Sequence, residues 1–153
     1  MKFHDYLNSQ KTEDRRAFIV HYPAKSGKTQ FAREICEQRE DAHLLDLQAY
    51  FLQHPELSPI RRLDFTKFKD LLLSLDMRED VILVDNVDFL FNTWRKKDKE
   101  KFSNWLKHQL RTPGDTKKTF IFVFQTDPFI ENIILVNSNQ ESRVLPMNEF
   151  ESI

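Results

Sequence analysis

Glycine is scarce in this sequence, because the 153 residues include only two, Gly27 and Gly114. Average usage would place about ten glycines in a chain of this length. Glycine is the residue that adopts a left-handed or otherwise tight backbone at little steric cost. A glycine between Ser26 and Lys28 therefore indicates a loop that needs one, and Gly114 suits a turn or a helix cap.

Cysteine, long apolar runs and an excess of either charge are also missing. The single cysteine, Cys36, excludes an internal disulfide and any multi-cysteine metal site. No apolar run approaches the ~18 residues of a membrane span, and the first residues lack the apolar region of a signal peptide. The net charge of −1 gives no global basic field for nucleic acid. These absences predict a soluble protein of a reducing cytoplasm.

Apolar residues are plentiful, at 40% of the chain with fourteen phenylalanines, which is enough for a well-packed core. We expect a single domain over residues 1–153. Residues 1–16 are expected to form a helical lead-in whose apolar residues share one helical face. Residues 148–153 form a short acidic tail.

A strand, a loop and a helix follow one another near the start of the chain. An apolar run predicts a strand over 17–22, and an apolar stripe predicts a helix over 28–39. The loop between them ends in Gly-Lys-Thr, which matches the end of the P-loop pattern G-x-x-x-x-G-K-[ST], or Walker A. Tyr22 replaces the first glycine of that pattern. Because tyrosine tolerates a left-handed backbone poorly, we expect this loop to leave the strand by a different path.

The loop carries the groups that hold phosphates in a P-loop. Successive backbone N–H groups and the positive end of the following helix attract phosphate oxygens. Lys28 is expected to reach the β- and γ-phosphates, and the Thr29 hydroxyl to ligate Mg²⁺. The ordinary alternative is a turn that simply opens a helix. The residues predicted to contact the nucleotide are Pro23, Ala24, Lys25, Ser26, Gly27, Lys28, Thr29 and Gln30.

A second informative stretch, residues 80–85, reads Asp-Val-Ile-Leu-Val-Asp. It predicts a buried strand that ends on the carboxylate of Asp85. In open parallel sheets, ligands bind beside the carboxyl ends of the strands. Asp85 is therefore expected to hold Mg²⁺ opposite Thr29, as Walker B carboxylates do. The alternative is an aspartate that merely ends a strand in a turn.

The rest of the chain predicts alternating strands and helices. Prolines break regular structure in a loop over 54–63 that carries Arg61 and Arg62. The mixed-charge run 95–101 is either a solvated helix face or a contact with a phosphate backbone. The further predicted elements are strands at 43–47, 119–124 and 143–147, and helices at 48–53, 65–75, 87–92, 98–111 and 128–136.

The order of these elements predicts a three-layer α/β fold around a parallel sheet of five strands with right-handed crossovers. A polar residue at the tip of the strand after Asp85 can face the γ-phosphate, with Thr126 the first choice and Gln125 the second. The alternative is that both residues simply begin a turn.

The pattern resembles the additional-strand P-loop ATPases of the AAA+ and RecA kind, without a C-terminal helical lid. In that resemblance Thr126 or Gln125 corresponds to the sensor residue. The resemblance also implies Arg143 as an arginine finger that reaches the nucleotide of a neighbouring subunit in a homo-oligomer.

A narrower resemblance rests on Tyr-Pro-Ala-Lys-Ser-Gly-Lys-Thr followed by Leu-Val-Asp-Asn-Val-Asp. In a single P-loop domain of this size, these motifs are similar to those of the BrxF family, the small P-loop proteins of type III BREX phage-defence systems. The resemblance covers roughly residues 15–147. It implies a bacterial cytoplasmic ATP-binding protein that works with larger BREX components on phage or host DNA. No membrane partner is expected, because the sequence has no apolar run of sufficient length.

One departure from the AAA+ pattern bears on turnover. Asn86 stands where these enzymes usually have a glutamate that polarises the attacking water. An amide orients water but cannot accept its proton, and loss of a general base costs on the order of 10²–10⁴ in rate. Asp88 is an alternative base.

We therefore expect ATP and Mg²⁺ as ligands and slow hydrolysis. A non-hydrolysing, nucleotide-dependent module that binds protein or DNA is the alternative. A small-molecule kinase with Arg61 and Arg62 in its lid is a third reading.

Overall fold

The computed structural model describes residues 1–23, 28–110 and 116–150, except for the side chains of Lys28, Thr29 and Arg61. The strands are β1 (Ala17–Tyr22), β2 (Ala42–Asp46), β3 (Val81–Asp85), β4 (Thr119–Gln125) and β5 (Val144–Pro146). The α-helices are α1 (Phe3–Gln10), α2 (Lys28–Gln38), α3 (Leu47–Gln53), α4 (Phe65–Leu73), α5 (Asp88–Phe91), α6 (Lys96–His108) and α7 (Pro128–Glu131). Short 3-10 helices are η1 (Pro55–Leu57), η2 (Ile60–Arg62) and η3 (Met147–Glu149).

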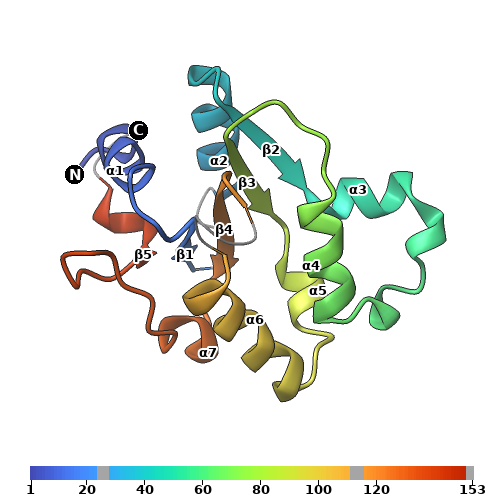
Figure 1. The fold of residues 1–153 in the computed structure, drawn as a ribbon. Coiled ribbons are helices and arrows are strands. Elements are labelled where there is room, and N and C mark those ends of the chain that lie inside the picture. The colour runs from blue at the N-terminus through green and yellow to red at the C-terminus, as the bar shows by residue number, and fades with distance from the viewer. Residues whose placement is uncertain (24–27, 111–115, 151–153) are drawn as a thin grey trace.

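The strands form one five-stranded sheet in the order β2-β3-β4-β1-β5, and every neighbouring pair is parallel (Figure 1). The predicted α/β fold with five parallel strands is therefore confirmed. Among the described residues, no helix combines the length and the apolar character needed to cross a membrane.

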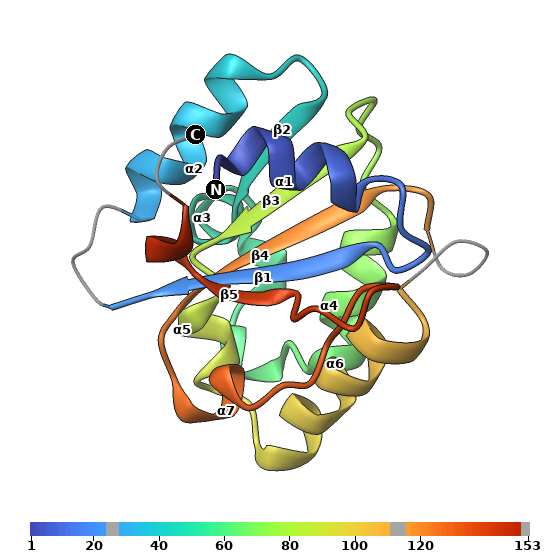
Figure 2. The same ribbon diagram turned by 90° about the vertical axis from the view of Figure 1, so that its left-hand side faces the viewer.

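Helices cover both faces of the sheet (Figure 2). α1 and α2 pack on one face against Phe18, Val20 and their neighbours. The helices α3 to α7 pack on the other face, against Ala17 and Ile19. Because successive side chains of a strand point to opposite faces, the single apolar run of β1 supplies both cores.

The core under α5 and α6 is rich in aromatic rings. Phe102 on α6 lies edge-on to Phe122, with ring centroids 5.2 Å apart, and Phe91 on α5 lies edge-on to Phe124 at 5.1 Å. Such edge-to-face pairs are a favoured arrangement of aromatic rings. They hold α5, which begins at Asp88, against the carboxyl end of β4.

The connections after β1 and β4 leave the sheet in opposite directions. The connection from β1 to β2 carries α2 over one face, and the connection from β4 to β5 carries α7 over the other. Right-handed crossovers that run in opposite directions lie on opposite faces. The carboxyl ends of β1 and β4, from which these two connections start, are therefore the position at which open α/β sheets bind ligands.

The helix predicted over 128–136 is wrong beyond its first turn. α7 ends at Glu131, and the Asn132 side chain donates a hydrogen bond to the Pro128 carbonyl at 2.7 Å. Ile133 and Leu135 are buried while Ile134 is 73% exposed, which is the two-residue period of an extended chain. The apolar residues of this segment therefore fit an extended path along the core as well as a helix.

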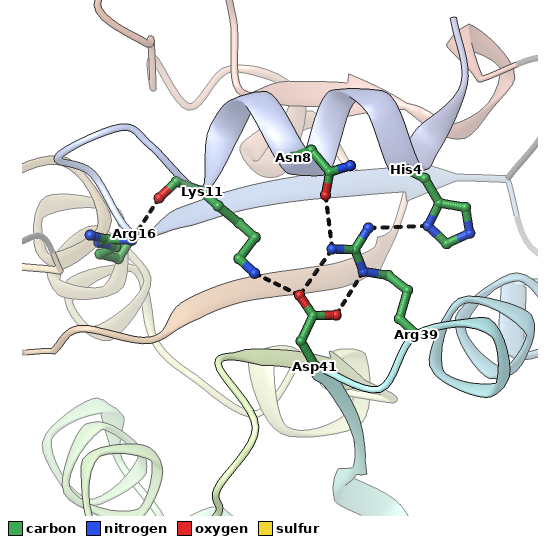
Figure 3. A network of polar contacts seen from close by, with 6 residues as sticks. All are labelled: His4, Asn8, Lys11, Arg16, Arg39 and Asp41. Atoms are coloured by element: carbon green, nitrogen blue, oxygen red, sulfur yellow. Dashed lines mark hydrogen bonds and ion pairs between the residues drawn. The ribbon is translucent and has the colours of Figure 1, made fainter.

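α1 is fixed to the rest of the fold by a polar network between it and the turn before β2 (Figure 3). The Arg39 guanidinium donates to both carboxylate oxygens of Asp41, at 2.8 and 2.9 Å, and to the Asn8 side chain at 2.9 Å. Lys11 donates to the same carboxylate at 2.6 Å. The hydrogen bonds and positive charge of Arg39, and after them those of Lys11, hold the pKa of the Asp41 carboxyl far below its usual range. The network joins the end of α1 to the start of β2.

Candidate functional site

Polar side chains gather where the central strands end. β2 ends on Asp46, β3 on Asp85, and β4 on Gln125, which Thr126 follows. Parallel strands bring their carboxyl ends to the same edge of the sheet. The start of α2 also lies at this carboxyl edge, because β1 ends at Tyr22 and only a short loop connects it to the first residue of α2, Lys28.

Asp85 is the buried carboxylate of this edge, with only 1% of its surface exposed. Its Oδ1 accepts a hydrogen bond from the Asn86 backbone N–H at 2.8 Å. Asn86 has a φ of 56°, a left-handed conformation that asparagine tolerates better than most residues. The predicted buried strand that ends on Asp85 is therefore present. The role of the Asp85 carboxylate in binding Mg²⁺ stays a prediction.

The Asn86 side chain is turned toward the neighbouring strand. Its Nδ2 donates to Asp46 Oδ1 at 2.9 Å. The same Asp46 oxygen accepts from the backbone N–H groups of Gln48 and Ala49 and so caps α3. Asn86, predicted to position the attacking water, thus links the tips of β2 and β3.

Asp88 is bound to the tip of β4. Its Oδ1 accepts from the Gln125 backbone N–H at 2.8 Å. A small cavity of about 40 Å³ lies between α5 and α7, lined by Asp88, Gln125, Thr126 and Asp127 among others. Its volume and polar lining suit a water molecule. The structure thus brings together Asp88 and both candidate sensor residues, which are exposed at the strand tip.

His21 is a site residue that the sequence analysis missed. It lies in β1 with 6% of its surface exposed, and its Nδ1 is 3.0 Å from the Thr126 hydroxyl. The Thr126 backbone N–H also donates to the Tyr22 carbonyl at 2.9 Å. Burial lowers the pKa of His21, against an opposing effect from the charge of Glu131. The available signal was a single histidine inside an otherwise apolar central strand.

Tyr22 continues β1 at the position where the P-loop pattern has its first glycine. It is 1% exposed and pairs with Gln125 in the β1–β4 register, so the backbone here is extended. Burial raises the pKa of Tyr22 strongly, and the negative charges of Asp85 and Asp88 add to that effect. The phenol therefore stays protonated and lies within electrostatic range of both carboxylates.

The predicted phosphate cradle lies largely outside the described residues. Ala24, Lys25, Ser26 and Gly27 are outside that part of the chain, and so are the side chains of Lys28 and Thr29. Pro23 and Gln30 are exposed on either side of the loop. The Gln30 amide donates to Glu34 on the surface of α2 at 2.9 Å.

Arg143 does not take the place predicted for it. Its guanidinium is fully buried and donates to the Arg15 carbonyl at 2.7 Å, and it lies 5.7 Å from the centre of the Phe18 ring. Arg143 precedes β5, so it lies toward the amino ends of the strands, and burial lowers its pKa to about 10. A buried side chain at that end does not reach a neighbouring subunit's nucleotide. The buried position of Arg143 contradicts the predicted arginine finger, while the predicted homo-oligomer itself stays a prediction.

Comparison with protein-family models, curated proteins and solved structures gives no match. Within the described part of the chain, no three His, Cys, Asp or Glu side chains gather as a metal cluster. A magnesium ion bound mainly by phosphates needs only one or two protein ligands, so Asp85 with Thr29 remains a suitable set. The carboxyl edge between β1, β3 and β4 is the candidate functional site.

Proposed function

We propose that this chain binds ATP and Mg²⁺ at the carboxyl edge of its sheet and hydrolyses ATP slowly. One observation carries the proposal: Asp85 is buried at the tip of β3, on the edge at which α2 begins directly after the loop from β1. A phosphate-binding loop and a magnesium carboxylate need this relation to each other. The crevice between β1 and β4 is the corresponding nucleotide position.

Each group at the edge has a task in the proposal. Backbone N–H groups of residues 23–30 would hold the phosphates, with help from the positive end of α2. Lys28 would neutralise the γ-phosphate, and Thr29 with Asp85 would hold Mg²⁺. The metal would offset charge on the β- and γ-phosphate oxygens, while the protein positions the reactants.

The position of β4 supports the additional-strand class of P-loop ATPase. β4 lies between β1, which precedes the loop, and β3, which ends on Asp85. Its tip therefore faces the space between the loop and the carboxylate. Thr126 is the proposed sensor, and His21 holds its hydroxyl in place.

A non-hydrolysing, nucleotide-dependent module is the second candidate, favoured by a specific observation. The groups proposed to handle water already make hydrogen bonds within the fold, Asn86 to Asp46 and Asp88 to Gln125. In this candidate the nucleotide stabilises a surface for protein or DNA. Lys97 and Lys101 are exposed on α6 and would meet a phosphate backbone there, while Lys99 lies over the Phe91 ring.

The cellular role is also a proposal. The two motifs of the loop and of β3 support a component of a bacterial anti-phage defence complex of the BREX type, with other BREX proteins as partners. Co-purification of the tagged chain with such proteins from one host, lost in Lys28→Ala, would support it. Recovery of the same partner proteins with the tag alone as with the tagged chain would contradict it.

Phosphate release tests the two candidates against each other. The ATPase proposal predicts Mg²⁺-dependent release of phosphate from ATP, with or without duplex DNA, that Asp85→Asn removes. Asp70→Asn, a change at an exposed position of α4, is the matched control and should release phosphate like the unchanged chain. Release indistinguishable from buffer under all conditions would contradict hydrolysis and favour the module.

A further inference from the structure

A polar hollow of about 890 Å³ opens along α1, beside β5 at the end of the sheet. It is lined by α1, by the segment 137–142 that leads into β5, and by Glu149 of η3. In Figure 2 these segments face the viewer, with α1 in dark blue and β5 in red. The hollow shares no lining residue with the carboxyl edge, so it is independent of the proposed nucleotide site.

The lining of the hollow is acidic. Four carboxylates contribute to it, those of Asp5, Glu13, Glu141 and Glu149, and the described lining residues include no lysine, arginine or histidine. Glu13 is held in place by the Ser138 hydroxyl, which donates to its Oε1 at 3.0 Å. Clustered carboxylates of this kind raise the local concentration of cations.

Buried polar groups in the wall lack partners. Gln10 is 4% exposed, and its Nε2 donates to Ser9 at 3.2 Å, but its Oε1 has no hydrogen-bond partner among the described residues. The buried Tyr6 hydroxyl lies near Arg143, without a well-aligned hydrogen bond to any described residue. Burial raises the pKa of Tyr6 to about 12, Arg143 opposes that rise, and the charges of Glu141 and Glu149 add to it. Because buried acceptors are nearly always paired, the Gln10 oxygen points to a donor other than the described residues.

The backbone beside the hollow is closed to an added strand. The Ser142 hydroxyl lies 3.1 Å from both the N–H and the C=O of Val144, and Pro146 has no N–H. Such features protect a sheet edge from pairing with another chain. Recognition here therefore rests on side chains, which favours a small ligand over an extended peptide.

We propose that this hollow binds a small aliphatic cation with two or more ammonium groups, of the polyamine class. An ammonium group offers three donors and no acceptor, which suits a wall of carboxylates and an amide oxygen. The volume is within the usual range of small-molecule sites. Several separated carboxylates suit several separated charges, whereas no described group of three gathers closely enough for a metal ion.

Calorimetry with spermidine at fixed ionic strength tests the proposal. We expect saturable binding by the unchanged chain, weakened about tenfold in the double variant Asp5→Asn and Glu141→Gln. Glu100→Gln, which removes an exposed carboxylate on α6, is the matched control and should bind like the unchanged chain. Equal affinity in all three proteins would overturn the proposal, as would binding of an uncharged diol of the same length with equal affinity.

Gln10→Leu separates a ligand contact from a structural role. Because it removes a buried amide whose oxygen has no partner among the described residues, the variant should be at least as stable as the unchanged chain, while spermidine binds more weakly. A variant with unchanged spermidine affinity would contradict the role of this oxygen. An arginine-containing peptide that binds where spermidine does not would contradict the polyamine class.

Discussion

Single residues at the two ends of the sheet lie in different surroundings. Asp85 and Thr126 are at the carboxyl edge, where polar residues stand at the strand ends. Arg143 is toward the amino ends of the strands and is fully buried, and its guanidinium donates a hydrogen bond to the Arg15 carbonyl. Its burial and position assign Arg143 to stability rather than to catalysis.

Arg143→Ala should therefore lower the free energy of unfolding by about 2 kcal/mol or more, because it removes buried packing and leaves the Arg15 carbonyl without its donor. Denaturation with urea measures this. Arg78→Ala is the control, since the Arg78 side chain is 92% exposed, and its effect should stay within about 0.5 kcal/mol. If Arg143→Ala were as stable as Arg78→Ala, the structural role would be wrong.

His21 should make stability depend on pH. Its pKa is lowered in the folded chain, mainly by burial, so the unfolded state takes up a proton first. The stability that this residue contributes is present above the unfolded pKa of about 6.5 and is lost as the pH falls. We expect urea denaturation at several pH values between about 5 and 8 to show that the free energy of unfolding falls less toward acid pH in His21→Gln than in the unchanged chain.

The control for that comparison is His108→Gln, at an exposed position of α6. It should keep the pH dependence of the unchanged chain. An identical pH dependence in His21→Gln and the unchanged chain would contradict a neutral, buried His21 that positions Thr126.

At the scale of elements, the sequence predicted most of the fold. The central strands β1, β3 and β4 are short apolar runs, and such runs are typical of strands buried on both faces of a sheet. The helix over 128–136 was wrong because its apolar residues fit a two-residue period as well as a helical one. The local sequence pattern alone does not distinguish a helix from an extended chain here, because the packing of Ile133 and Leu135 on the core decides between the two.

The candidate site was predicted only in part, for similar reasons. The sequence places Asp85 and Thr126 at strand tips, because a strand's end is a local feature. The bonds of His21 to Thr126 and of Asn86 to Asp46 join residues 105 and 40 positions apart, which no local pattern contains. The burial of Arg143 depends on packing against Tyr6 of α1 and Phe18 of β1. Its place just before the last strand, from which the finger role was predicted, carries no information about that burial.

The attachment of α1 gives a prediction at this scale. Asp41→Asn removes the carboxylate that Arg39 and Lys11 bind, and it should lower the free energy of unfolding by about 1–2 kcal/mol. The pKa of Asp41 is lowered in the fold, so this contribution is present above its unfolded pKa of about 3.9 and is lost at more acid pH. Denaturation at pH 7 measures the difference.

The control pair is Lys96 and Glu100, which lie 3.9 Å apart on the exposed face of α6. Glu100→Gln should cost about 0.5 kcal/mol or less, because exposed ion pairs contribute little. A cost for Asp41→Asn no larger than that for Glu100→Gln would show that the network does not hold α1.

At the scale of the whole molecule, the fold separates two polar regions. The carboxyl edge lies where the connections after β1 and β4 turn to opposite faces of the sheet, and the acidic hollow lies beside β5 at the end of the sheet. The proposed nucleotide site is the first of these regions. β4 lies between β1 and β3 in this parallel sheet, so a phosphate loop after β1 and the Asp85 carboxylate would face the same ligand there, and ATP with Mg²⁺ is the ligand that both would bind.

Calorimetric titration of the full chain with ATP in the presence of Mg²⁺ tests nucleotide binding at the carboxyl edge. We expect saturable binding that Lys28→Ala weakens by at least about tenfold, because the substitution removes the charge that would meet the phosphates. Lys97→Ala on the exposed face of α6 should leave the affinity unchanged. Normal ATP binding by Lys28→Ala, or no ATP binding by the unchanged chain, would contradict a nucleotide site at this edge.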